Sequence, residues 1–327
     1  MLRKNLFAIV YSVLLTAFTV YVLMDTFVIT RIYSTVPVVE ASSEAGSDGA
    51  DSDTAVADSY SAVAEAAVNA SASDQTGESP TSQQPVSTAT SYQDENITIP
   101  WTQYREYDPS IYVADITLSS PEYLQTALAQ NAYGRNVTEK TSEMAVENGA
   151  ILAINGDYYG SQESGYVLRN GVLYRDIAER GQEDLVIYED GSFEIITEDE
   201  VTAQELLDRG AVQILSFGPA LVTDSEVSVT AGEEVGKAKS SNPRTAIGVI
   251  DDLHYVFVVS DGRTDESEGL SLYELAEFMS ELGAETAYNL DGGGSSSMVF
   301  NGNVINNPTT SGNRIKERSV SDIVYIG

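Results

Sequence analysis

Residues able to bind and cleave a small anionic group are concentrated between Tyr288 and Met298, which read Y-N-L-D-G-G-G-S-S-S-M. An apolar run ends at Asp291, and three glycines and three serines follow it. Glycine adopts positive φ without steric cost and lets backbone amides approach a ligand closely. The turn can therefore present Asp291, several N–H groups and the hydroxyls of Ser295 and Ser296 to one anion. The alternative is a glycine-rich connection without a function, because such turns are common.

Other polar turns also border apolar strands. They are Asn155-Gly156-Asp157, Pro243-Arg244-Thr245 and Asp261-Gly262-Arg263, and a basic group formed by Arg314, Lys316 and Arg318 precedes the last strand. The chain has 17 Lys and Arg against 50 Asp and Glu, so basic residues beside glycine turns stand out. Converging arginines suit an anionic substrate, because the guanidinium fork matches phosphate or carboxylate. A surface ion pair also explains each arginine taken alone, and a turn preference explains an aspartate before glycine.

Composition excludes several kinds of protein. The chain has no cysteine, so disulfides, thiolate metal sites and a cysteine nucleophile are ruled out. Its net charge of −33 argues against nucleic acid as a partner, because nucleic acid requires positive patches. A Ser-His-Asp triad would have to use His254, the single histidine, which we instead expect to be a strand residue.

The N-terminal segment has the pattern of a membrane anchor. Leu6 to Met24 carries no charge, Arg3 and Lys4 precede it, and Asp25 follows it. A run of this length spans a hydrocarbon core, and the charge asymmetry favours a cytoplasmic N-terminus. We predict a single-pass anchor over residues 1–31 in the membrane of a bacterial cell, with the rest of the chain outside the cell. A cleaved signal peptide is the competing interpretation.

The next segment, residues 32–96, is acidic and rich in Ser and Ala, with few large aliphatic side chains. Such a sequence buries too little apolar surface to offset its ordering entropy, so we predict a disordered spacer. Residues 97–327 are long enough for one sizeable core.

Local patterns over residues 97–327 predict many strands and few helices. We expect strands at 111–118, 150–154, 211–217, 285–290 and 320–326, hairpins within 185–196, 245–260 and 298–305, and helices at 121–130, 141–147, 202–209 and 271–282. The last helix begins with a capping box formed by Ser271 and Glu274. These elements indicate an α+β fold, a single domain with a largely antiparallel mixed sheet.

Seven short motifs occur in order along residues 145–327. They are N-G-D-Y-Y at 155–159, F-G-P-A-L-V at 217–222, N-P-R-T-A-I-G at 242–248, S-D-G-R at 260–263, G-L-S-L-Y-E-L-A at 269–276, N-L-D-G-G-G-S-S at 289–296 and E-R-S-V at 317–320. This ordered set resembles the phosphodiester glycosidase domain family. The chain departs from the family at Tyr158-Tyr159, where phenylalanine is also usual, and at Ser297, where threonine is common.

The resemblance implies hydrolysis of a sugar-1-phosphodiester between the anomeric carbon and the phosphate oxygen, on cell-surface or exopolysaccharide-type glycans. It implies no cofactor and no metal. A phosphate leaving group needs less acid assistance than an ordinary alcohol, so the site must chiefly stabilise charge and place a carboxylate at the anomeric carbon.

Roles for individual residues follow from that expectation. We expect the phosphate to be held by Arg244, Arg318, Gly292, Gly293, Gly294, Ser295 and Ser296. Asp291 and Asp261 are the candidate base or nucleophile. Asn155, Gly156 and Asp157 would contact the sugar or complete the acid–base set, and Arg263 would hold Asp261 in place.

Two other kinds of protein stay open on the sequence. One is a non-catalytic surface module that binds anionic glycans. The other is a hydrolase in which Asp157, Asp261 and Asp291 hold a hard cation such as Ca²⁺ or Mg²⁺. The oligomeric state cannot be predicted from these patterns.

Overall fold

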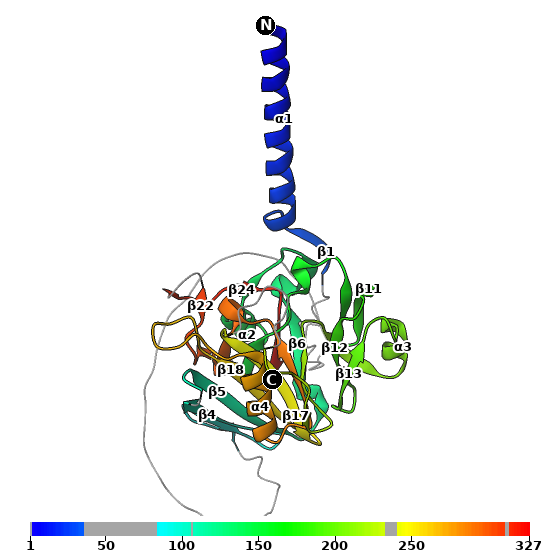
Figure 1. The fold of residues 1–327 in the computed structure, drawn as a ribbon. Coiled ribbons are helices and arrows are strands. Elements are labelled where there is room, and N and C mark those ends of the chain that lie inside the picture. The colour runs from blue at the N-terminus through cyan, green and yellow to red at the C-terminus, as the bar shows by residue number, and fades with distance from the viewer. Residues whose placement is uncertain (1, 36–83, 106, 233–240, 311–313) are drawn as a thin grey trace, which may run out of the picture. The chain divides into compact units, whose positions relative to one another are not determined.

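The structure is a computed structural model, and it describes residues 2–35, 84–105, 107–232, 241–310 and 314–327 (Figure 1). Side chains are described from residue 10 onward, except that of residue 27. The predicted spacer lies largely outside these residues. Its two ends, however, are strands: β1 (Arg31–Thr35), and β2 (Val86–Ser87) with β3 (Ser91–Gln93). The folded part therefore includes residues before 97, contrary to the sequence-based boundary.

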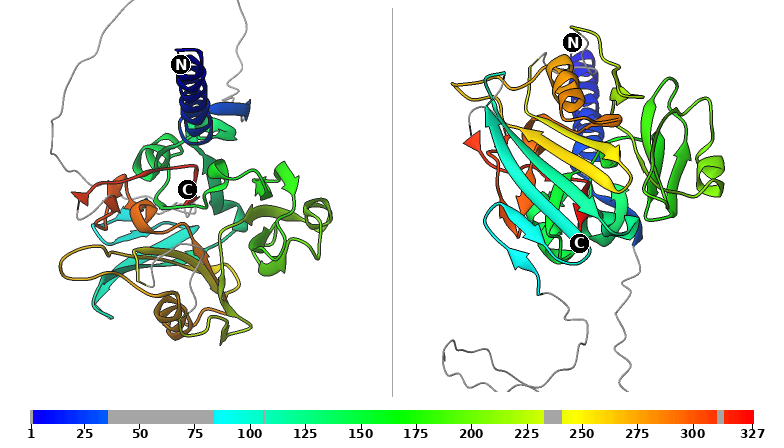
Figure 2. Two further views of the ribbon diagram at one scale, coloured as in Figure 1. Left: turned by 45° about the horizontal axis from the view of Figure 1, so that its top comes forward. Right: turned by 90° about the horizontal axis from the view of Figure 1, so that it is seen from below.

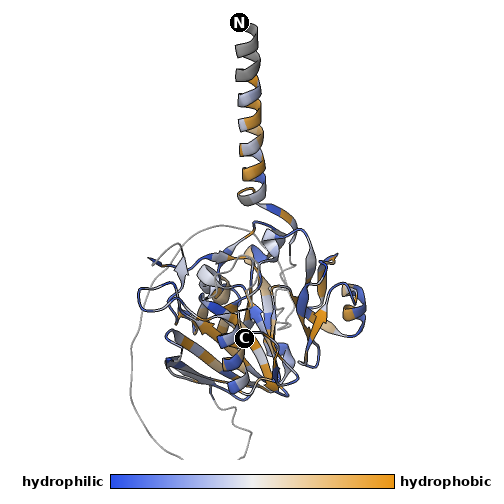
Figure 3. Cartoon of the chain, viewed as in Figure 1, coloured by the Kyte–Doolittle hydropathy of each residue, from blue (hydrophilic) through white to orange (hydrophobic). Residues whose placement is uncertain are grey.

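The largest element is a nine-stranded antiparallel sheet. Its order is β16 (Glu226–Val227), β15 (Ala220–Thr223), β19 (Thr286–Leu290), β17 (Arg244–Asp251), β18 (His254–Ser260), β5 (Ser110–Leu118), β4 (Ile97–Arg105), β3 and β2. The central strands β17, β18 and β19 are buried along most of their length, and hydrophobic residues, drawn in orange in Figure 3, are frequent in the sheets.

A second sheet packs against this one. Its order is β21 (Asn303–Val304), β20 (Met298–Phe300), β9 (Leu152–Asn155), β25 (Asp322–Ile326) and β6 (Leu124–Leu128). The main core lies between the two sheets and includes Phe257 and Tyr288 from the first and Ile154 and Val324 from the second. Two facing sheets thus form a β-sandwich.

Short helices cover the outer faces of this sandwich. α4 (Leu272–Glu281) packs its apolar side, including Leu275 and Met279, on the nine-stranded sheet. α2 (Thr141–Glu147) packs Met144 and Ala145 on the other sheet. Each helix is amphipathic and contributes one buried stripe to a sheet.

A third sheet lies at one side of the sandwich, in green in Figure 2. Its order is β11 (Val172–Ile177), β10 (Gly165–Arg169), β14 (Ala211–Leu215), β12 (Glu183–Tyr188) and β13 (Phe193–Thr197). α3 (Ala203–Asp208) covers it and contributes Leu206 to a separate small core.

Three short antiparallel pairs complete the described fold. They are β1 with β7 (Ala132–Arg135), β22 (Thr309–Thr310) with β23 (Arg314–Ile315), and β24 (Ser319–Val320) with β8 (Glu139–Lys140). The N-terminal segment forms α1 (Leu2–Phe27). No helix within the part of the chain that the structure describes combines the length and apolarity needed to cross a membrane.

Most elements predicted from local sequence are confirmed. The hairpins β12–β13, β17–β18 and β20–β21 form as expected, and every strand pair between described residues is antiparallel. The helix predicted over 121–130 is wrong. Pro121–Tyr123 is a single 3₁₀ turn, and β6 follows it, because Leu124–Leu128 pairs with β25. A distant strand overrides the local helix signal.

The site residues are brought together by strand ends. Asn155 ends β9 and lies opposite Ile323 of β25, while Leu290 ends β19 and lies opposite Thr245 of β17. The polar turns that follow β9 and β19 and precede β17 and β25 therefore meet at one edge of the sandwich.

The N-terminal cap of α4 gives a stability test. The Ser271 side chain accepts a hydrogen bond from the Glu274 N–H, and Glu274 reaches back to the Ser271 N–H. We expect Ser271→Ala to lower the free energy of unfolding by about 1 kcal/mol in urea denaturation. Ser271→Asp should stay close to the unmodified protein, since aspartate also caps; equal loss in both variants would contradict the capping role.

Candidate active site

The centre of the site is a contact among Asp291, Ser295 and Arg318. The Ser295 hydroxyl donates to Asp291 Oδ2 at 2.6 Å, and Arg318 Nη2 donates to the same oxygen at 2.8 Å. Arg318 Nε also donates to Ser295 Oγ at 2.8 Å. The Asp291 side chain is 15% exposed and that of Arg318 is 43% exposed. The carboxylate is therefore largely enclosed, while the guanidinium reaches solvent.

The glycine turn fits this contact because it has no side chains. Gly293 has φ 63°, and a Cβ built there would lie 2.5 Å from Arg263 Nη2. The Gly293 N–H donates to the Pro243 carbonyl at 2.8 Å, so the turn lies against the segment that contains Arg244. Glycine permits both this backbone conformation and the close approach of a second arginine.

Arg263 is the second guanidinium at the turn. Its Nε and Nη2 donate to Asn242 Oδ1 at 3.2 and 3.1 Å. It thus lies against Gly293 and Asn242, and not against Asp261 as the sequence analysis expected. Burial lowers the pKa of Arg263, and the neighbouring charge of Arg318 lowers it further. Two arginines and one carboxylate give this part of the site a local excess of positive charge.

Electrostatics set the protonation of Asp291. Burial raises the pKa of its carboxyl group, whereas Arg318, the Ser295 hydroxyl and the Gly292 amide act to lower it. The net shift is upward. A carboxyl group with a raised pKa in a cleft is a candidate for acid–base or nucleophilic chemistry.

Asn155 ties the turns together from inside. Its Nδ2 donates to the Asp291 carbonyl at 2.6 Å, and its Oδ1 accepts from the Thr245 hydroxyl at 2.8 Å and from the Ser297 N–H at 3.2 Å. Asn155 is fully buried. Its side chain is therefore committed to positioning the backbone of the site.

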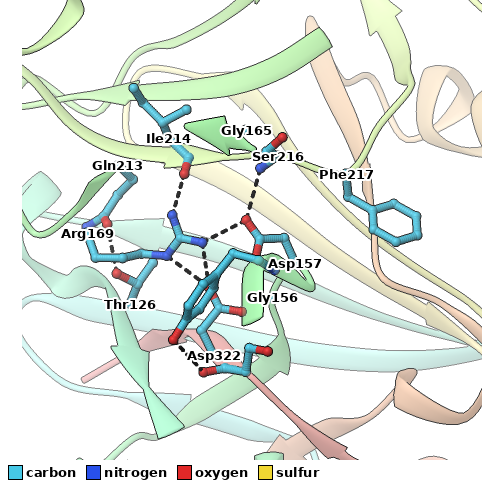
Figure 4. Close-up of polar contacts among 12 residues, drawn as sticks. Thr126, Gly156, Asp157, Gly165, Arg169, Gln213, Ile214, Ser216, Phe217 and Asp322 are labelled. Carbon is cyan, nitrogen blue, oxygen red and sulfur yellow. Dashed lines mark hydrogen bonds and ion pairs between the residues drawn. The ribbon is translucent and has the colours of Figure 1, made fainter. Parts of the chain in front are cut away.

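Behind the site lies a buried charged group formed by Asp157, Arg169 and Asp322 (Figure 4). Arg169 Nη2 contacts Asp157 Oδ2 at 2.7 Å and Asp322 Oδ2 at 2.6 Å. The Ser216 N–H donates to Asp157 Oδ2 at 3.0 Å, and the Tyr159 N–H donates to Oδ1 at 2.9 Å. These three charged side chains are at most 2% exposed.

The buried charged group has two carboxyls for one guanidinium. Burial and the charge of Asp157 raise the pKa of Asp322, against the opposite effect of Arg169. Protonation of Asp322 leaves one negative and one positive charge. This arrangement has a lower free energy in a buried site than two negative charges beside one positive charge. Gly156 is required beside it, because a Cβ there would lie 2.4 Å from Asp322 Oδ1.

A depression of about 330 Å³ opens over these groups. It is lined by Thr138, Asp157, Tyr158, Ser161, Asp291, Ser295, Arg318, Ser319, Val320 and Ser321. Its volume lies in the range of small-ligand sites, roughly 300–1,000 Å³. The lining is rich in hydroxyls and carboxylates, which suits a polar ligand with many hydrogen-bonding groups.

Two residues of the predicted site, Asp261 and Arg244, do not line this depression. Asp261 accepts hydrogen bonds from the Asn307 N–H at 2.8 Å and from Asn307 Nδ2 at 3.0 Å, and it lines a different depression from Asp291. Arg244 is buried, and its Nε donates to the Leu270 carbonyl at 3.0 Å. Within the described ranges, no group of three or more His, Asp or Glu side chains is arranged to hold a metal ion.

Arg169 and Asp322 were missed by the sequence analysis. Both are charged residues in otherwise apolar strands, Y-V-L-R and D-I-V-Y-I. A charge in such a run indicates a buried partner of opposite sign, and this signal could have identified the pair.

Known proteins resemble the C-terminal part of this chain in sequence. The model of the phosphodiester glycosidase family matches residues 148–327. The chain is 32% identical over 180 residues to the SPbeta prophage-derived uncharacterized protein YomE of Bacillus subtilis (strain 168), covering 54% of this chain and 28% of YomE. It is 27% identical over 184 residues to N-acetylglucosamine-1-phosphodiester alpha-N-acetylglucosaminidase of Mus musculus, covering 51% of this chain and 35% of that enzyme. The chain thus spans about a third of the length of these relatives.

Solved structures share the fold. The zebrafish N-acetylglucosamine-1-phosphodiester alpha-N-acetylglucosaminidase catalytic domain, auto-inhibited by its pro-peptide, superposes with a TM-score of 0.55 at 21% identity. That match covers 70% of this chain and 82% of the zebrafish chain. A hypothetical protein from Synechocystis gives a TM-score of 0.51 at 16% identity, covering 71% of this chain and 62% of the other.

Removal of Arg169 tests the buried charged group. We expect Arg169→Met to destabilise the protein by roughly 3–5 kcal/mol, because Asp157 is left as a buried, uncompensated charge. Adding Asp157→Asn and Asp322→Asn to Arg169→Met should recover a large part of that loss. Urea unfolding of the single and triple variants measures both effects, and equal stability of the two would contradict the charge-pairing account.

Proposed function

Because the chain belongs to the phosphodiester glycosidase family, we propose that it hydrolyses a sugar-1-phosphodiester at the bond between the anomeric carbon and the phosphate oxygen. Water supplies the oxygen that ends on the sugar, and the products are a free sugar and a phosphomonoester. The observation that carries this proposal is the contact of Asp291 with Ser295 and Arg318 in the lining of a polar depression.

The phosphate is assigned to the arginine side of the depression. Arg318 is partly exposed and borders the depression, and Arg263 lies beside it over Gly293. Guanidinium groups at this position stabilise the negative charge that the departing phosphate gains in the transition state. Arg244, which the sequence suggested for this role, is buried and does not line the depression, and its Nε donates to the Leu270 carbonyl.

The reaction at the anomeric carbon is assigned to Asp291. Asp157 is enclosed, with both oxygens accepting hydrogen bonds from protein groups, and Asp261 lines a separate depression. Asp157 also lines the depression, but its side chain is fully buried and paired with the buried Arg169. The Asp291 side chain is 15% exposed and is paired with Arg318, which reaches solvent. It acts as a carboxylate, either adding to the anomeric carbon or deprotonating the attacking water.

Turnover of a defined substrate tests the function and the role of Asp291 together. The purified chain would be incubated with a synthetic N-acetylglucosamine-1-phosphodiester, with and without EDTA, while released reducing sugar is measured. We expect release in both conditions and a fall of at least about 100-fold in kcat for Asp291→Asn. Asp190→Asn is the matched control, because Asp190 lies in the β12–β13 turn and bonds only Ser192 among described residues.

The outcomes separate the three kinds of protein. Saturable binding without release would make the chain a glycan-binding module. If EDTA abolishes the release of sugar, the acidic residues bind a metal ion that the reaction requires. Normal turnover by a folded Asp291→Asn protein would overturn the assignment of Asp291.

The raised pKa of Asp291 predicts the pH dependence of the reaction. A catalytic carboxylate loses activity as pH falls through its pKa, so the acid limb of kcat/KM should lie above the ordinary value for aspartate, about 3.9. The Ser295 hydroxyl lowers this pKa by its hydrogen bond. Ser295→Ala should therefore move the acid limb to higher pH, and a limb that stays in place or moves down would contradict the assignment.

We also propose that the N-terminal segment anchors the protein in the cell membrane, with the hydrolase domain outside. The support is the sequence, since residues 6–24 carry no charge and basic residues precede them. The full chain should sediment with membranes after carbonate washing, and the paired substitution Leu14→Arg and Phe18→Arg should release it. External protease should cleave the domain in intact cells; a protected domain or a carbonate-soluble full chain would argue against the anchor.

A further inference from the structure

One aromatic residue stands among the polar groups of the depression. Tyr158 is the only aromatic side chain among the described residues that line it, and it follows Asp157 directly in the chain. It is half-buried, so part of its ring remains accessible. No step of the proposed reaction uses this residue.

The Tyr158 ring is held by a second aromatic side chain. Phe217 contacts it edge to face, with 4.9 Å between ring centroids and 73° between ring planes. The Phe217 N–H donates to the Tyr288 hydroxyl at 2.8 Å, and that hydroxyl donates to the Glu183 carbonyl at 2.7 Å. Tyr288 is fully buried in the main core. Phe217, which holds the Tyr158 ring, is therefore itself held in place by the core of the sandwich.

The backbone on each side of Tyr158 is fixed as well. Asp157 belongs to the buried charged group, and Tyr159 is 1% exposed. The Tyr159 N–H donates to Asp157 Oδ1, and the Ser161 N–H donates to the Tyr158 carbonyl at 2.9 Å. A ring held in this way loses little conformational freedom when a ligand binds against it.

Tyr158 lines the same depression as Asp291, the carboxylate assigned to the reaction. Burial raises the pKa of the Tyr158 hydroxyl, and the negative charges of Asp291 and then Asp157 raise it further. The hydroxyl therefore stays protonated at neutral pH and remains a hydrogen-bond donor at the rim of the ring.

A pyranose matches this combination of groups. Its rim is a belt of hydroxyls, which suits the serines and carboxylates of the lining, and its faces carry C–H groups, which are apolar. Packing such a face on an aromatic ring removes apolar surface from water while the rim keeps its hydrogen bonds. A phosphate or an acidic peptide would gain nothing from the ring.

We propose that Tyr158 is the sugar-binding platform of this site, with its ring against the C–H face of the pyranose whose anomeric carbon meets Asp291. The proposal rests on the proposed function. It divides recognition into two parts: Tyr158 selects the sugar, and Arg318 holds the phosphate. Because Arg318 is partly exposed, the phosphate end of the site opens toward solvent.

Variants of Tyr158 test this division. With the N-acetylglucosamine-1-phosphodiester, Tyr158→Leu should raise KM about tenfold and change kcat less, because the apolar contact is lost in ground and transition states alike. Tyr158→Phe keeps the ring and should stay within about twofold of the unmodified chain. Tyr273→Leu, on α4 and outside the depression, is the control for loss of a tyrosine.

Inorganic phosphate as a competitive inhibitor separates the two parts of the site. Its inhibition constant should be unchanged in Tyr158→Leu and should rise about tenfold or more in Arg318→Ala. An unchanged KM in Tyr158→Leu, or a parallel rise of the phosphate inhibition constant, would overturn the platform.

Failure of the proposed function would give a different result. If the unmodified chain releases no sugar, the hydrolase assignment fails, and equilibrium binding of N-acetylglucosamine to the same variants decides the platform. Weaker binding in Tyr158→Leu than in Tyr158→Phe would support it, and equal or absent binding in all of them would overturn it.

Discussion

The fold of the site depends on one buried cation. Arg169 projects from β10 and joins Asp157, which follows β9, to Asp322 at the start of β25, while Ser216 after β14 completes the contact. Four segments from two sheets are thereby tied at a single guanidinium. A planar group with five donors can satisfy several acceptors at once, which a lysine at this position could not do in the same geometry. The small sheet is fastened to the sandwich at the place where the depression opens.

Around that cation the polar groups fall into two kinds. The side chains of Asn155, Asp157 and Asn242 form hydrogen bonds with other groups of the protein and help to position the turns of the site. Asp291, Arg318 and Tyr158 line the depression and are at least partly exposed, whereas Asp157 is fully buried. The separation explains how a strongly acidic chain, with a net charge of −33, can carry the anion-binding site that we propose. Local geometry brings two arginines to one glycine turn, and the overall charge is carried elsewhere.

Local signals in the sequence predicted much of this arrangement. Local patterns located α2, α3 and α4, the last with its capping box, and they also located the hairpins. The strand β6 was mistaken for a helix because its pairing partner, β25, lies almost two hundred residues away. The polar turns were recognised, but whether Arg244 and Asp261 face the depression depends on side-chain direction after packing, which spacing does not encode. Arg169 and Asp322 are buried by tertiary contacts, so each looked like a single charge without a partner.

The strands β4 and β5 also determine how short a fragment of this chain can be and still fold. The family model matches residues 148–327, yet β4 and β5 lie before that range, and β5 pairs with β18 along seven residues. A gene fragment cut at the start of the matched range would leave β18 as a bare hydrophobic edge, a template for self-association. The unit that evolution can move between proteins, or that a laboratory can express alone, is therefore longer than the unit that sequence similarity outlines.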